Sequence, residues 1–165
     1  MIARYRFHRN QTLEFSQAVI DTFLKYRQSP GMDEAGGILL GNVYTTSHTI
    51  VEAATTPGSL DRAGPYYFER SRAAAQAVVN SSWRESGGVL IYLGEWHTHL
   101  AASPTPSRRD RAMIRNMLRQ TEMAIDCLVL VVVGTENAWV GIDDGRRLAK
   151  LSPCYDQPSS CPACF

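Results

Sequence analysis

The sequence predicts a single α/β domain in which helices pack against a mixed sheet. Apolar residues fall into strand-like runs and helix-like stripes that follow one another in the order β-α-β-β-α-β-α-β-β-β. With 165 residues, 44% of them hydrophobic and 20% charged, the chain is long enough to bury one core. No repeat or internal boundary is visible. We assign residues 1–151 to the domain and residues 152–165, rich in Pro, Ser and Cys, to a C-terminal tail.

The N-terminal part is expected to contain a strand, a helix and a pair of strands. Residues 2–8 alternate as in a short edge strand. Thr12 or a neighbour caps a helix that runs to about Arg27, with an apolar stripe at helical spacing. A Pro-Gly pair ends this helix. Residues 34–41 and 48–55 then form two paired strands.

The C-terminal part alternates helices and strands and ends in a hairpin. Residues 89–96 are an apolar strand, and 125–133 is the most β-prone run of the chain. A proline at the first helical position favours a helix from about Pro106 to Gln120. Asp144-Gly145 is a good turn pair for a hairpin. The other expected elements are a loop over 57–65, a helix over 70–83, a linker over 100–106 and hairpin strands over 137–143 and 146–151.

Composition excludes several classes of protein. The formal net charge of +1 provides no bulk attraction to nucleic acid or to an anionic membrane surface. No apolar run approaches the roughly 20 residues that a membrane-spanning helix needs. Residues 1–10 lack the apolar core of a signal peptide, and four cysteines do not form a disulfide scaffold. We therefore expect a cytoplasmic protein with no nucleic-acid or membrane partner.

The motif that ends the strand over residues 89–96 is the candidate functional site. His97 and His99 stand two apart, so in a strand their side chains point to the same face. Ser107 and Asp110, three apart at the start of the next helix, also share a face. Two imidazoles and one carboxylate are the donor set of a catalytic zinc site, which keeps a fourth position open for water. We therefore predict that His97, His99 and Asp110 bind one Zn²⁺.

Hydrolysis at such a site also needs a carboxylate that takes a proton from water and passes it to the leaving amine. Glu34 is the candidate, because it opens a strand that can lie beside the histidine strand. A Gly-Gly pair close behind it allows the backbones to approach each other. Ser107 can direct its hydroxyl at the oxygen of a tetrahedral intermediate. Glu34 and Ser107 are therefore the predicted catalytic residues.

These residues resemble the JAMM motif, also called MPN+: Glu, then His-Ser/Thr-His, seven residues, Ser, two residues and Asp. The context Glu-Ala-Gly-Gly-Ile-Leu-Leu-Gly around Glu34 is typical of small prokaryotic members of that family. Leu100 departs from the family pattern, in which proline usually follows the second histidine. The resemblance covers residues 33–133. It implies a JAMM/MPN-type domain with a mixed curved sheet flanked by three helices.

The resemblance also implies an activity. In the family the two histidines and the aspartate bind zinc, the glutamate is general acid and base, and the serine stabilises the intermediate. Family substrates are bonds after the C-terminal glycine of ubiquitin or ubiquitin-like proteins. A chain this short with Gly-Glu-Trp-His-Thr-His looks most like the deconjugases of CBASS antiphage operons. There, an E1/E2-like enzyme links a cGAS-like nucleotidyltransferase to target amines. The implied partners are such a conjugate, or a ubiquitin-like protein with an extended tail, and the E1/E2-like enzyme.

Two other functions use similar residues. The family also includes MPN scaffolds that bind without cutting, so a non-catalytic module recognising a ubiquitin-like tail or a partner subunit is the alternative. Intact positions for all five functional residues argue against it. A zinc deaminase is the second alternative. That chemistry usually uses a cysteine-rich zinc site with a glutamate beside a ligand histidine, as Glu95 is beside His97, and it leaves Asp110 without a role.

The cysteines suggest a second, less favoured metal site. Cys154, Cys161 and Cys164 form C-x6-C-x2-C, but a structural zinc needs four ligands and only three are present. We favour a tail with reduced or adventitiously oxidised thiols over a second ion. Cys127 lies in an apolar run and is expected to be a buried small hydrophobe.

Aromatic residues near the site have two possible roles. Tyr66, Tyr67 and Phe68 either line a groove for an extended peptide tail or pack in the core at the start of the second helix, which we favour. Trp96 is expected to pack on the opposite face from His97, because neighbouring residues of a strand alternate.

Overall fold

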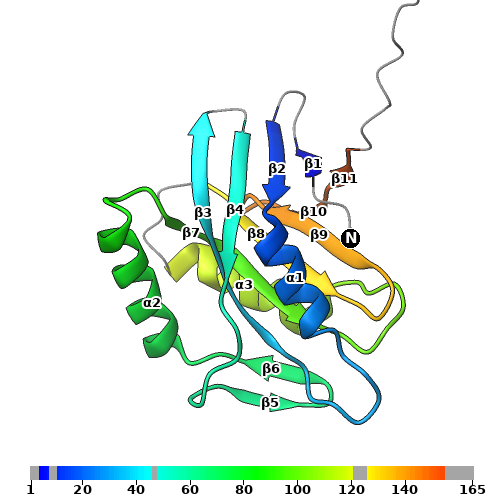
Figure 1. The fold of residues 1–165 in the computed structure, drawn as a ribbon. Helices are drawn as coiled ribbons and strands as arrows, with labels where there is room; N and C mark the ends of the chain where they lie inside the picture. The colour runs from blue at the N-terminus through cyan, green and yellow to red at the C-terminus, as the bar shows by residue number, and fades with distance from the viewer. Residues whose placement is uncertain (1–3, 8–10, 46–47, 121–125, 155–165) are drawn as a thin grey trace, which may run out of the picture.

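A nine-stranded mixed sheet organises the molecule (Figure 1). The computed structural model describes residues 4–7, 11–45, 48–120 and 126–154. The strand order is β10-β9-β8-β7-β3-β4-β2-β1-β11, and a separate two-stranded sheet consists of β5 and β6. The strands are β1 (Arg4–Phe7), β2 (Gln11–Phe15), β3 (Gly36–Thr45), β4 (His48–Ala54), β5 (Arg62–Gly64), β6 (Tyr67–Glu69), β7 (Ile91–Thr98), β8 (Leu128–Val133), β9 (Ala138–Asp143), β10 (Leu148–Lys150) and β11 (Ser152–Pro153).

The sheet is curved, and a single residue of the chain connects its two edge strands. β10 is one edge and β11 is the other, yet only Leu151 separates them in the chain. Leu151 is buried, and its N–H donates to the Val140 carbonyl while β11 pairs with β1. The β2–β4 and β7–β8 pairs are parallel and the others antiparallel, so the predicted mixed, curved sheet is confirmed.

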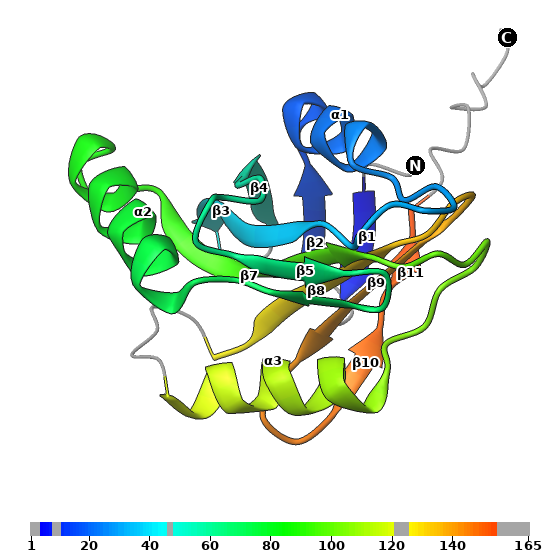
Figure 2. The same cartoon turned by 90° about the horizontal axis from the view of Figure 1, so that it is seen from below.

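Three helices flank this sheet, as predicted: α1 (Gln17–Lys25), α2 (Arg72–Glu85) and α3 (Arg108–Gln120). Figure 2 shows α1 and α3 on opposite sides of the sheet and α2 beside it. Phe23 of α1 joins the larger core, where its ring lies 5.1 Å from that of Trp96. Ile114 of α3 joins a second core under β8 and β9. Trp96 therefore packs on the face opposite His97, as its position in the strand predicts.

The predicted start of the first helix is wrong. Residues 11–15 form β2, which pairs in parallel with β4, and the helix begins only at Gln17. Ser16 caps it, because its hydroxyl accepts a hydrogen bond from the Val19 N–H at 3.4 Å. Thr12 instead lies in β2 and contacts His48 through its hydroxyl. Pairing with β4 outweighs the local preference for an earlier start.

Two further local predictions need correction. The expected loop over 57–65 contains β5, which pairs with β6 to form a hairpin around Pro65 and Tyr66. Strands of three residues are too short to show a period, so no sequence pattern predicts them. Cys127 precedes β8 and is half-buried rather than fully buried. Cys161 and Cys164 lie outside the described residues. Among the described residues, no helix is long and apolar enough to cross a membrane.

An irregularity in β7 sets which face its side chains occupy. The register against β3 shifts between Leu39 and Leu40, so that Leu93 has no partner, and Gly94 has a φ of 154°. Leu93 and Trp96 both face the larger core. Regular alternation would place residues three apart on opposite faces, so the bulge reverses the phase of the strand. Glu95 and His97 are thereby directed toward α3.

Candidate metal centre and active site

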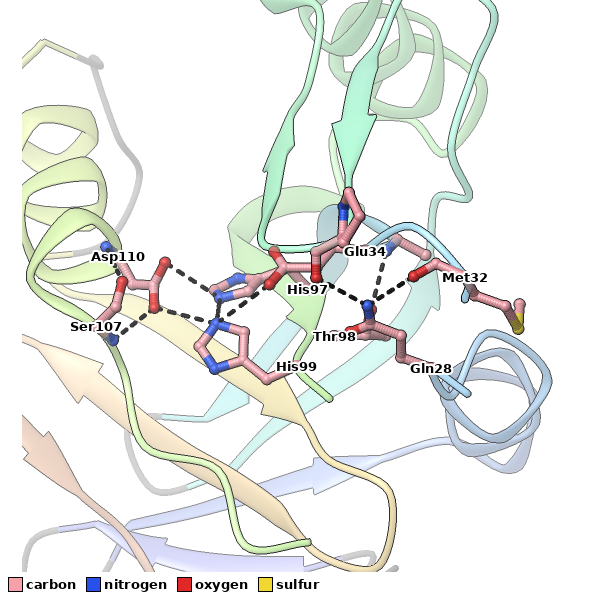
Figure 3. Close-up of polar contacts among 10 residues, drawn as sticks. Gln28, Met32, Glu34, His97, Thr98, His99, Ser107 and Asp110 are labelled. Carbon is pink, nitrogen blue, oxygen red and sulfur yellow. Dashed lines mark hydrogen bonds and ion pairs between the residues drawn. The ribbon is translucent and has the colours of Figure 1, made fainter. Parts of the chain in front are cut away.

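Three segments bring the five predicted site residues together (Figure 3). His97 lies opposite Gly36 in the last residue pair between β7 and β3, and His99 follows directly after β7. Glu34 lies two residues before β3, next to the end of β7. Asp110 is in the first turn of α3, where the linker after His99 has turned back toward the sheet. The antiparallel β3–β7 pair therefore places Glu34 beside the histidines, as the sequence analysis expected.

The two imidazoles and the Asp110 carboxylate have the spacing of a metal site. The two Nε2 atoms are 3.2 Å apart. His97 Nε2 lies 3.3 Å from Asp110 Oδ1, and His99 Nε2 lies 3.4 Å from Oδ2. In a tetrahedral site with bonds of about 2.0–2.1 Å, ligand atoms are separated by about 3.3 Å. Among the described residues, these three form the only cluster of this kind. The donor set and its spacing fit a tetrahedral metal ion.

Asp110 is oriented by the start of its own helix. Its Oδ2 accepts a hydrogen bond from the Ser107 N–H at 2.6 Å, and the Ser107 hydroxyl accepts one from the Asp110 N–H at 3.2 Å. This reciprocal pair is a capping box, in which an aspartate takes the place of the usual glutamate. Ser107 therefore positions the carboxylate, and its hydroxyl hydrogen is not used in this contact.

Glu34 lies at the edge of the cluster and is buried. Its Oε1 is 4.0 Å from His99 Nε2, which is farther than the 3.2–3.4 Å between the atoms of the three proposed ligands. Glu34 therefore lies next to this cluster rather than within it. Burial raises the pKa of Glu34, which the neighbouring histidines only partly offset. A carboxyl group whose pKa is raised toward neutrality is suited to accept and return a proton.

The trio itself is polarised. Burial alone would raise the pKa of Asp110, but hydrogen bonds with His97 and His99 outweigh it and hold that pKa well below its usual range. Burial disfavours the charged imidazole of His99, yet its contacts with Asp110 and Glu34 raise the pKa of this histidine. Both shifts have the same cause, because the ionised Asp110 carboxylate and a positive charge beside it stabilise each other.

A groove of about 670 Å³ opens beside the cluster. The β5–β6 hairpin forms one wall and α3 the other, while Glu95 and Trp96 of β7 lie at its base. The side chains of α3 that line it, at positions 109, 110, 113, 117 and 120, follow one face of the helix. Its lining also includes both histidines, Glu34 and Ser107.

The aromatic residues of the hairpin line this groove rather than the core, contrary to the favoured prediction. Tyr66 is 85% exposed and Tyr67 38% exposed. Arg109, beside Asp110, reaches across to this wall. Its guanidinium lies 5.5 Å from the centre of the Tyr67 ring and 3.7 Å from the Glu69 carboxylate.

Sequence reasoning missed a buried ion pair at the base of the groove. Arg70, just after β6, donates to both carboxylate oxygens of Glu95 at 2.6–2.9 Å. The Tyr92 hydroxyl donates to the same carboxylate at 2.5 Å. Burial, together with the charge of Glu95 and this hydrogen bond, raises the pKa of this tyrosine. Glu95 was visible only as a neighbour of His97. Its position beside Arg70 and Tyr92 depends on the bulge at Gly94, which leaves no sequence signal beyond a glycine.

The fold and the site define a hydrolase of the JAMM type. Residues 16–143 match the family described as prokaryotic homologs of the JAB domain, and the chain belongs to that family.

Similar proteins agree with this assignment. The chain is 42% identical to a CD-NTase/cGAS isopeptidase from Pseudomonas aeruginosa, over 62% of this chain and 66% of that protein. It is 32% identical to a protein of the same name from Vibrio cholerae, over 74% of this chain and 76% of that one. The solution structure of DSY2949 from Desulfitobacterium hafniense is similar in fold, with a TM-score of 0.61. That match has 17% identity and covers 84% of this chain and 88% of the other.

Proposed function

We propose that this protein is a zinc-dependent isopeptidase or peptidase that cleaves after the C-terminal residue of a ubiquitin-like or ubiquitin-like-conjugated protein. The observation that carries the proposal is the placement of Glu34, 4.0 Å from His99, at the edge of a three-ligand cluster that opens into a groove. A scaffold that only binds a tail has no need for such a cluster.

The relatives named CD-NTase/cGAS isopeptidases support a narrower substrate. We infer that the acyl partner is a cGAS-like nucleotidyltransferase joined through its C-terminus to an amine. The reaction would reverse the work of an E1/E2-like enzyme, in bacterial antiphage defence.

His97, His99 and Asp110 would hold the zinc ion. When bound, zinc lowers the pKa of water and polarises a carbonyl group. Glu34 takes the proton of the attacking water and later gives it to the leaving amine, so one carboxyl group serves as base and then as acid. The hydroxyl hydrogen of Ser107 is available to donate to the oxygen that gains negative charge at the scissile carbonyl.

The groove has the length of an extended tail. Gln120 is eleven positions after Arg109, which at about 1.5 Å per helical residue is about 16.5 Å of wall. An extended peptide rises about 3.3 Å per residue, so about five residues fit. Met113 and Met117 provide adaptable apolar surface along this wall.

The test is cleavage of a nucleotidyltransferase whose C-terminus is joined to a lysine side chain, compared with a ubiquitin-like fusion. We expect zinc-dependent release that a chelator abolishes. Glu34→Gln should retain one zinc per chain and lose about 10²–10⁴-fold in kcat. His97→Ala should lose zinc and activity together. Glu85→Gln, an exposed carboxylate on α2, is the matched control and should behave as wild type.

Three outcomes would change the proposal. Binding of the tail without any cleavage by the zinc-loaded protein would favour the scaffold function. Cleavage of the ubiquitin-like fusion alone would replace the nucleotidyltransferase as substrate. Full activity in Glu34→Gln would contradict the assigned general base.

A further inference from the structure

Thr98, the residue between the two histidines, makes an unusual contact with the segment that carries Glu34. Its N–H donates to the Ala35 carbonyl at 2.8 Å, as in a normal antiparallel pair. The return bond of such a pair would run from the Ala35 N–H to the Thr98 carbonyl. Instead, the Ala35 N–H donates to the Thr98 hydroxyl oxygen at 2.9 Å. The side chain replaces the main chain at the last rung of the β3–β7 ladder.

The use of a side-chain acceptor instead of a main-chain one has a geometric consequence for Glu34. Because the final bond goes to a side chain, the β3–β7 ladder ends at Ala35 without leaving the N–H of this buried residue unpaired. Glu34 is the first residue beyond that point. Its carboxylate lies near the metal cluster, while its backbone lies next to the end of β7, which carries His97 and leads directly into His99.

The backbone of Glu34 is also held from the other side. Its N–H donates to the carbonyl of Gly64 at 2.9 Å, at the end of β5, where the turn of the β5–β6 hairpin begins. Gln28 fixes the same turn, because its amide Nε2 donates to the Pro65 carbonyl at 3.1 Å and to the Met32 carbonyl at 2.8 Å. Gln28 is 2% exposed. Figure 3 shows Gln28 and Thr98 on the side of Glu34 away from Asp110.

We propose that Thr98 is a positioning residue that sets the distance between Glu34 and the metal ligands through its hydroxyl bond to Ala35, with Gln28 as a second support. Thr98 itself is fully buried, lies on the side of Glu34 away from the ligand cluster (Figure 3) and does not line the groove, so it would contact neither metal nor substrate. This inference rests on the proposed role of Glu34 as general base. The new element is that the residue at position 98 must carry a hydroxyl group, whatever the size of its side chain.

The first test compares three substitutions. Thr98→Val keeps the shape and removes the acceptor, whereas Thr98→Ser keeps the hydroxyl. Thr22→Val is the matched control, since it removes a similar hydroxyl bond, to the Ala18 carbonyl at 2.9 Å, on a helix remote from the site. We expect Thr98→Val to lower kcat about 10- to 100-fold, the scale of small misplacements of a reacting group. KM and zinc content should change little, and Thr98→Ser should restore most of the rate.

A double-mutant cycle separates positioning from general destabilisation. If Thr98 acts through Glu34, Thr98→Val has no further effect on the residual rate in a Glu34→Gln background. Gln28→Met should behave in the same non-additive way. Additive losses in the cycle, or loss of zinc in proportion to loss of activity, would overturn the proposal.

A measurement without substrate decides the contact itself. Amide hydrogen exchange of Ala35 should be at least tenfold faster in Thr98→Val than in wild type, and unchanged in Thr98→Ser and Thr22→Val. Exchange at the wild-type rate in Thr98→Val refutes the anchor even if the variant is less active. If the wild-type protein cleaves no tail substrate, the proposed function fails, while this result still decides whether Thr98 holds the segment of Glu34.

Discussion

The bulge in β7 predicts a large difference between two glycine substitutions. Gly94 and Gly87 both have positive φ, 154° and 66°, so alanine is strained at each position. They differ in what a Cβ atom would meet. At Gly94 it would lie 1.9 Å from the Val129 carbonyl oxygen, whereas at Gly87 nothing lies within 4 Å. The pair therefore separates steric clash from backbone strain.

The expected cost of Gly94→Ala follows from the pairing of β7 with β8. Restoring an ordinary contact of 3.4 Å requires a movement of about 1.5 Å at the Gly94–Val129 pair. Such a movement breaks neighbouring backbone hydrogen bonds between two buried strands, and each group left unpaired costs about 1–3 kcal/mol. We expect Gly94→Ala to lose about 4 kcal/mol or more of the free energy of unfolding. Gly87→Ala should lose only about 1–2 kcal/mol, the strain of a left-handed alanine.

Urea denaturation of both metal-free variants measures this difference, with zinc content as a second readout. Because His97 lies three residues after Gly94 in β7 and His99 directly follows that strand, we expect Gly94→Ala also to bind zinc more weakly. Backbone strain alone costs each alanine variant a similar amount, about 1–2 kcal/mol. A difference in unfolding free energy of less than about 1 kcal/mol between the two variants would therefore refute the role given to the bulge.

Three further predictions concern charged residues. Arg70→Ala should cost about 3–5 kcal/mol in urea denaturation, because it leaves the buried Glu95 charge uncompensated, and Arg70→Met with Glu95→Gln should recover much of this. Arg109→Ala breaks an exposed pair with Glu69 and should cost less than about 1 kcal/mol by the same assay. The raised pKa of Glu34 means that the folded state favours its protonated form, so its contribution to stability is present at low pH and lost as pH rises through the folded pKa. Glu34→Gln should therefore raise the Tm of the metal-free protein at pH 7, with a smaller gain at pH 4. An equal Tm gain at both pH values would contradict burial as the cause.

Local patterns predicted the elements that depend on few partners. The His-x-His spacing and the following Ser-x-x-Asp spacing place side chains by strand and helix geometry alone, and the structure brings these residues within hydrogen-bonding distance. The stripe around Ile114 likewise predicted a helix that packs on the sheet. Patterns of period 2 or 3.6 are visible whenever an element is long enough to repeat them.

The missed features depend on partners far away in the chain. β2 becomes a strand because it pairs with β4, whose paired residues lie 36 positions later in the chain. Arg70 and Glu95 meet across 25 residues, and their pairing reflects the bulge rather than any local period. The β5–β6 hairpin is too short to show alternation. In each case, a tertiary contact decided between local conformations that the sequence left nearly equal.

Thr98 shows where the two kinds of information meet. Strand alternation already implies that the residue between His97 and His99 points away from a metal bound by both. That argument excludes Thr98 as a ligand but does not identify its partner, because Ala35 lies 63 residues away. The structure places this partner next to the proposed general base. A hydroxyl between the two histidines thus connects the strand that would hold the metal with the segment that would move the proton. This explains why valine, which has a higher β propensity and the same shape, should fail at this position.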